Sequence, residues 1–136
     1  MRVLRFLLAL DSAVLILLGF LLIVAPHLAA TAFRFGDLPP GVHYLVGLWG
    51  CALLTLGGGY LVAATDPVRH VAWIQVGIAR GALECLLGLF YVARGIVTFQ
   101  QAGFGIVLAG LLALAYGVFY PRKPARDPAP AARPAA

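Results

Sequence analysis

Charged side chains are scarce in this sequence, and acidic ones most of all. Of its 136 residues, 11% are charged and only 5 are aspartate or glutamate, whereas 62% are hydrophobic. A soluble domain carries roughly a quarter charged residues, because its surface must be hydrated. The chain has too little polar surface for a water-soluble globule, so lipid is the solvent expected around most of it.

Reactive residues and catalytic motifs are also rare or missing. The two cysteines, Cys51 and Cys85, lie inside apolar stretches and are interpreted as small buried hydrophobic residues, not as a disulfide or a metal site. His27, His43 and His70 fall at the ends of apolar stretches, so no histidine pair is placed to hold a haem at depth. The sequence contains no CxxC, HExxH, Walker-type glycine loop or nucleophile elbow. We therefore expect no catalytic residue, no cofactor and no metal, and a protein that is not an enzyme.

Four long apolar runs are present, at about residues 4–25, 42–64, 71–93 and 96–120. A helix of this length measures ~33 Å or more, enough to cross a hydrocarbon core of ~30 Å. The runs do not alternate at period two, so they predict helices and not a barrel. The predicted fold is an all-α integral membrane protein, an antiparallel four-transmembrane-helix bundle over residues 1–121. Residues 122–136 are rich in Pro and Ala and basic, and predict a disordered cytoplasmic tail.

The placement of Lys and Arg predicts the orientation of these helices. With the N-terminus inside, only Arg34 and Arg94 fall on the outer side. The other basic residues that flank the helices fall on the cytoplasmic side, which positive charge favours: Arg2, Arg5, Arg69, Arg122, Lys123, Arg126 and Arg133. The prediction is a multipass protein of the cell inner (cytoplasmic) membrane, N-in/C-in. This topology also accounts for the net charge of +5, so nucleic acid is not an expected partner.

The first apolar run has a second interpretation, as a secretory signal peptide. Arg2 and Arg5 precede the run, and Ala30-Thr31-Ala32 follows it in the manner of a cleavage site. The run is longer than a usual signal core, so the transmembrane interpretation is favoured. The intact mass of the purified protein distinguishes the two.

Three ionisable residues fall inside the predicted helices: Asp11, Arg80 and Glu84. Asp11 lies ~10 Å and Arg80 ~14 Å from the cytoplasmic ends of their helices. An arginine side chain can bridge that offset, and Glu84 follows Arg80 by four residues on the same helix face. We therefore predict a buried polar cluster of Asp11, Arg80 and Glu84, which brings the first long helix against the third. A structural ion pair that sets helix register is favoured over a proton-carrying or headgroup site.

Small residues recur at helical spacing in the last two apolar runs. Gly77 and Gly81 form a GxxxG pair, and a second ridge repeats every four residues. Its members are Gly105, Ala109, Ala113 and Gly117. Such residues let helices approach closely in lipid. Packing within the chain is the favoured interpretation, and binding of a partner's helix is the alternative.

Several short segments give the chain a family resemblance. These are Gly47-Leu48-Trp49-Gly50, Gly59-Tyr60-Leu61, Asp66-Pro67-Val68-Arg69-His70 and Tyr120-Pro121-Arg122. In them the chain resembles small bacterial four-helix membrane proteins of the DoxX-like and BphX-like kind, over residues 1–122. The resemblance implies the four-helix architecture and says little about activity. Small multidrug exporters are similar only in outline, because they use a glutamate in the first helix, where this chain has Asp11.

The leading functional hypothesis is a non-catalytic accessory or structural subunit of a larger membrane complex. Its expected partners are membrane lipid and other membrane subunits, or further copies of the chain. The alternative is a small proton-coupled transporter or permeation protein that uses the carboxylates of Asp11 and Glu84. A weaker alternative is a lipid- or quinone-binding protein.

Overall fold

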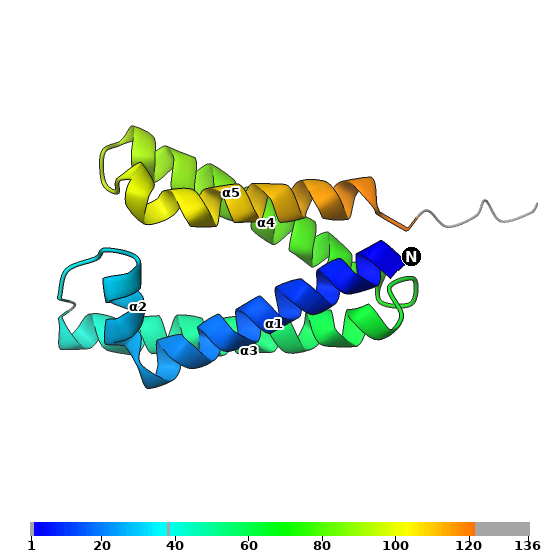
Figure 1. The fold of residues 1–136 in the computed structure, drawn as a ribbon, viewed down its shortest axis with the longest axis horizontal. Helices are drawn as coiled ribbons and strands as arrows, with labels where there is room; N and C mark the ends of the chain where they lie inside the picture. The colour runs from blue at the N-terminus through cyan, green and yellow to red at the C-terminus, as the bar shows by residue number, and fades with distance from the viewer. Residues whose placement is uncertain (1, 38, 122–136) are drawn as a thin grey trace, which may run out of the picture.

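The computed structural model describes residues 2–37 and 39–121, and over these residues it contains helices and no strand (Figure 1). The long helices are α1 (Arg2–Val24), α3 (Pro40–Thr65), α4 (Val71–Ala93) and α5 (Phe99–Val118), with a short α2 (Pro26–Ala32) between the first two. All four long helices are long and apolar enough to cross a membrane. The predictions of an all-helical fold and of four candidate membrane spans are confirmed. The predicted tail, residues 122–136, lies outside the described residues.

The long helices are arranged as two pairs. Helix α1 lies along α3 and forms the N-terminal pair, and α4 lies along α5 and forms the C-terminal pair (Figure 1). The pairs approach each other near the α3–α4 turn and diverge toward the end where α2 lies (Figure 1). The main neighbour of α1 is therefore α3, the second long helix, and not the third, α4, as sequence analysis predicted. Helix α1 reaches α4 through the side chains of Asp11 and Arg80.

Glycines allow the close approach within the N-terminal pair. A Cβ added at Gly19 would lie 2.7 Å from the backbone oxygen of Gly50, and a Cβ at Gly50 would lie 2.7 Å from the oxygen of Gly19. Below 3.0 Å a real Cβ would force the backbones apart. Ser12 adds a polar link, because its hydroxyl donates to the carbonyl oxygen of Gly57 at 2.7 Å.

Part of the predicted small-residue pattern joins α4 to α5. A Cβ at Gly81 would lie 2.6 Å from the backbone oxygen of Ala109 and 3.0 Å from the side chain of Ala113, and one at Gly77 would meet the ring of Tyr116 at 2.9 Å. These contacts are within the chain. The two remaining members of the ridge, Gly105 and Gly117, have nothing within 4 Å of an added Cβ.

The Gly19–Gly50 crossing makes a testable prediction. Gly50→Ala should lower the free energy of unfolding by about 1–3 kcal/mol, because the new methyl group overpacks the contact between two backbones. Gly58→Ala on the same helix is the matched control, since nothing lies within 4 Å of its added Cβ. The control should be neutral or stabilising by up to about 1 kcal/mol. Unfolding in a detergent titration measures both, and equal effects would contradict the crossing.

The loop after α2 joins the two pairs at their diverging end. Arg34 lies there in the left-handed region, with φ 58°. Its guanidinium donates to Gln100 Oε1 at 2.9 Å, and its carbonyl oxygen accepts from Gln101 Nε2 at 3.1 Å. Gln101 also accepts from the backbone N–H of Thr98 at 2.9 Å, which caps the start of α5 at Phe99. Helix α5 therefore begins three residues after the predicted position, and the loop is fastened to its first turn.

Candidate functional site

Asp11 is the most deeply buried ionisable residue of the predicted polar cluster. Its side chain is 1% exposed. Both of its carboxylate oxygens accept from Arg80 Nη2, at 3.2 and 3.3 Å. The Tyr116 hydroxyl donates to Asp11 Oδ2 at 2.7 Å. The structure thus brings Asp11 and Arg80 together across the two helix pairs and adds Tyr116 from α5.

Glu84 is held less firmly. Its carboxylate lies 3.8 Å from Arg80 Nε, which is an ion pair without a hydrogen bond, and its side chain is 36% exposed. Arg80 is therefore shared unequally: it is hydrogen-bonded to Asp11 and makes only a longer ionic contact with Glu84. Two carboxylates and one guanidinium leave one negative charge formally unbalanced, and Glu84 is the group at the open side of the cluster.

Two tyrosines complete the surroundings of Arg80. The fully buried ring of Tyr60 lies below its guanidinium, 5.4 Å from centroid to Cζ, and packs edge-on against Tyr116. Sequence analysis missed the part that Tyr60 and Tyr116 play. The buried hydroxyl of Tyr60 has no hydrogen-bond partner among the described residues. For Tyr116 the only signal was a phenolic hydroxyl within an apolar helix, which needs a partner when buried. Position alone did not identify Asp11 as that partner.

The Tyr116–Asp11 hydrogen bond can be tested. Tyr116→Phe should lower the free energy of unfolding by about 1.5–3 kcal/mol, because a hydrogen bond to a buried charged group is lost while the ring stays. Tyr120→Phe is the control: Tyr120 lies two residues beyond the end of α5, and its hydroxyl accepts from Gln75 at an exposed position. Its effect should be within about 0.5 kcal/mol. The measurement is unfolding in detergent, and similar losses for both variants would contradict the assignment.

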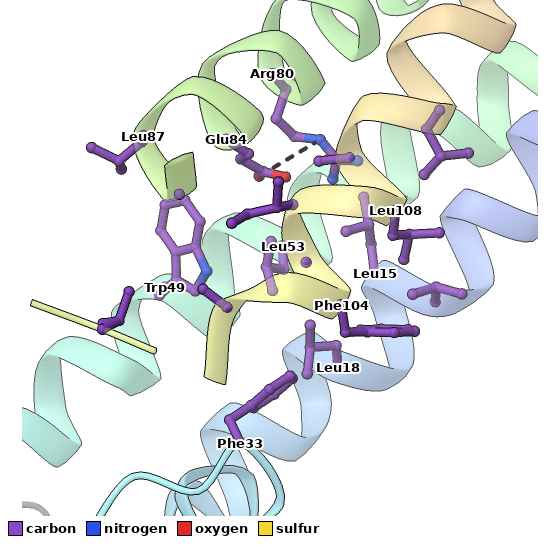
Figure 2. Close-up of a pocket in the computed structure, with 18 of the residues that line it drawn as sticks. Leu15, Leu18, Phe33, Trp49, Leu53, Arg80, Glu84, Leu87, Phe104 and Leu108 are labelled. Atoms are coloured by element: carbon purple, nitrogen blue, oxygen red, sulfur yellow. Dashed lines mark ion pairs between the residues drawn. The ribbon is translucent and has the colours of Figure 1, made fainter. Parts of the chain in front are cut away.

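A cavity of about 400 Å³ lies between the two helix pairs. Its lining is mainly apolar and comes from α1, α3, α4, α5 and the loop after α2. The charged residues in the lining are Asp11, Arg80 and Glu84. Figure 2 shows Arg80 and Glu84 at one end of the cavity, with Phe33 and Leu18 at the other. The polar cluster thus forms one end of an otherwise apolar cavity.

A second cavity, of about 530 Å³, adjoins the first near α2. None of the described residues that line it is charged. The two cavities share Leu18, Phe33, Phe35 and Trp49. Together they form an apolar region that ends at the carboxylate of Glu84.

The cluster does not resemble a metal site. Among the described residues no group of three or more His, Cys, Asp or Glu could hold a metal ion. Cys51 and Cys85 are free, and Cys51 is exposed, whereas sequence analysis had treated both as buried. The cavity instead combines a carboxylate and a guanidinium with an apolar wall, which is typical of sites that bind organic molecules.

Comparison with known proteins does not assign the chain to a family. No protein-family model, curated protein or solved structure matches it. The DoxX-like and BphX-like resemblance therefore stays a prediction, and function has to be argued from the cavity and the cluster.

Proposed function

We propose that this chain is a non-catalytic integral membrane protein that binds a lipophilic small molecule between its two helix pairs. One observation carries the proposal: a cavity of about 400 Å³ between the pairs has an apolar lining and three charged side chains at one end. Binding sites for small molecules are typically cavities of ~300–1,000 Å³ with an apolar lining and a few convergent polar groups. The hypothesis that was weakest from sequence is thereby the best supported.

Glu84 separates this proposal from a purely structural cluster. Asp11, Arg80 and Tyr116 already form a neutral, hydrogen-bonded set that links α1, α4 and α5. Setting helix register needs no second carboxylate, and an ionisable group inside a membrane is costly to keep. Glu84 adds nothing to the hydrogen bonds of the set, yet it lines the cavity. Contact with a ligand would explain the presence of Glu84, whereas helix packing does not.

A neutral lipophilic photoprobe, trifluoromethyl-phenyldiazirine, tests the proposal on the full chain in detergent. Labelling of cavity residues such as Leu53, which is 3% exposed, should saturate as the probe concentration rises. Labelling of Leu114, which is 68% exposed and outside the cavity lining, should rise linearly. Mass spectrometry of peptides gives both curves. Linear labelling at every residue would reject a binding cavity.

The proposed location is the cytoplasmic membrane, with an N-in/C-in topology. Arg2 and Arg5, in the first turns of α1, and Arg69, in the α3–α4 turn, lie at one end of the long helices, and Arg34 and Arg94 lie at the other. The positive-inside rule then supports a cytoplasmic position for the end that holds the α3–α4 turn.

Cysteine labelling of whole cells tests this topology. In a chain without Cys51 and Cys85, Gly36→Cys should react with a membrane-impermeant maleimide, and Asp66→Cys should react only after the cells are opened. Both positions are exposed in loops outside the long helices. The reverse pattern would place the N-terminus outside.

An accessory subunit remains a second candidate. Large apolar side chains are exposed on all four long helices, and nothing lies within 4 Å of a Cβ added at Gly117. Both features leave room for another membrane subunit. Purification in mild detergent should then recover partners in a fixed ratio. A clean monomer would count against this candidate and would leave the cavity proposal intact.

A further inference from the structure

The charges at the end of the cavity are unbalanced, and this imbalance selects among lipophilic molecules. The argument rests on the proposed function, since it concerns the ligand of the same cavity. Within residues 2–37 and 39–121, Arg80 is the only cation in the cavity lining, and its two hydrogen bonds in the cluster go to Asp11. Glu84 keeps only the longer contact of 3.8 Å. A further positive charge at the cavity end of the cluster would make it neutral.

Among the described residues, the other groups around Glu84 supply no second cation. From α1 it faces the carboxylate of Asp11, and from α3 and α5 the neutral phenols of Tyr60 and Tyr116 belong to the same cluster. An anionic ligand would add a third negative charge to this set. In a medium of low dielectric constant, like charges a few ångströms apart repel by several kcal/mol, and opposite charges attract by as much.

Five aromatic residues contribute to the apolar lining of the cavity. Phe33, Phe35, Trp49, Tyr91 and Phe104 come from the loop after α2 and from α3, α4 and α5. Aromatic faces attract cations, most strongly when water is excluded. They also provide apolar surface for a bulky organic body. The lining and the unbalanced carboxylate therefore favour the same kind of molecule.

We infer that the cavity binds a lipophilic organic cation, an ammonium or phosphonium with an apolar body, and that Glu84 is its counter-ion. Arg80 and Asp11 are positioning residues. Their ion pair holds the two helix pairs together and leaves the carboxylate of Glu84 free to face the cavity. The adjoining apolar cavity lengthens the space available to the body of the ligand.

Two ions of the same size and shape test the charge directly. Tetraphenylphosphonium and tetraphenylborate differ in the sign of their charge, and equilibrium dialysis against detergent without protein corrects for uptake by micelles. The full chain should bind the cation at least about tenfold more tightly than the anion. Glu84→Gln keeps the shape of the side chain and should remove this preference. Asp66→Asn, at the α3–α4 turn outside the cavity lining, should leave the preference unchanged.

The outcomes separate this inference from the proposed function. Equal binding of both ions, or preference for the borate, would overturn the cation assignment, and saturable labelling by the neutral photoprobe would still support the cavity. A preference that survives in Glu84→Gln would overturn the role of Glu84. Saturable photolabelling of Glu84→Gln shows that the variant is folded. Without saturable labelling or binding of either ion, the proposed function itself fails.

Discussion

Asp11→Ala is expected to lower the free energy of unfolding by about 3 kcal/mol. The substitution removes the carboxylate that accepts both hydrogen bonds from Arg80 and leaves the hydroxyl of Tyr116 without its acceptor. Breaking a buried ion pair by removing one partner typically costs about 3–5 kcal/mol, because the remaining charge is uncompensated. The lower end applies here, since Glu84 stays close to Arg80 and recovers part of the attraction.

Two further variants control for this result. The double variant Asp11→Leu with Arg80→Met removes both charges and should recover most of the lost stability, because apolar replacement of a buried pair is often neutral or better. Glu84→Gln should cost less than about 1 kcal/mol, since its carboxylate makes no hydrogen bond to Arg80 and is partly exposed. Unfolding in a detergent titration measures all three. A loss for Glu84→Gln as large as that for Asp11→Ala would contradict the unequal sharing of Arg80.

Gly105→Trp is expected to abolish saturable labelling by the neutral photoprobe, with at least a tenfold loss of apparent affinity. Gly105 lies in the wall of the cavity, and nothing is within 4 Å of an added Cβ, so an indole can enter the space that the probe would occupy. A group that fills a site excludes the ligand without a need to unfold the protein.

Gly117→Trp is the matched control for this substitution. Gly117 belongs to the same helix and the same small-residue ridge and is equally open, but it lies outside the cavity lining. Saturable labelling of the Gly117→Trp variant should be unchanged. The free energies of unfolding of both variants should lie within about 1 kcal/mol of that of the original chain. Equal loss of labelling in the two variants would show that the signal arises from the general lipid surface and not from the cavity.

Much of the architecture was predictable because it follows from local properties of the chain. Apolar runs of this length need a lipid solvent, and in lipid they need internally paired backbones, so four candidate spans followed from hydropathy. The approach of Asp11 to Arg80 was predictable for a related reason. Isolated charges are costly in hydrocarbon, and few partners were available to them.

Which helices pair, and what lies between the pairs, was not predictable in this way. No hydrophobic force drives one helix toward another in lipid, so pairing depends on close fits such as Gly19 against Gly50 and Gly81 against Ala109. The chain has 16 glycines that could make such fits, and spacing does not distinguish those that do from open ones such as Gly105. The same holds for Tyr116 and Ser12, whose hydroxyls find their partners 105 and 45 residues away. The unequal sharing of Arg80 and the cavity beside Glu84 exist only once the two pairs are placed, because both depend on ångström-scale separations between segments that are distant along the chain.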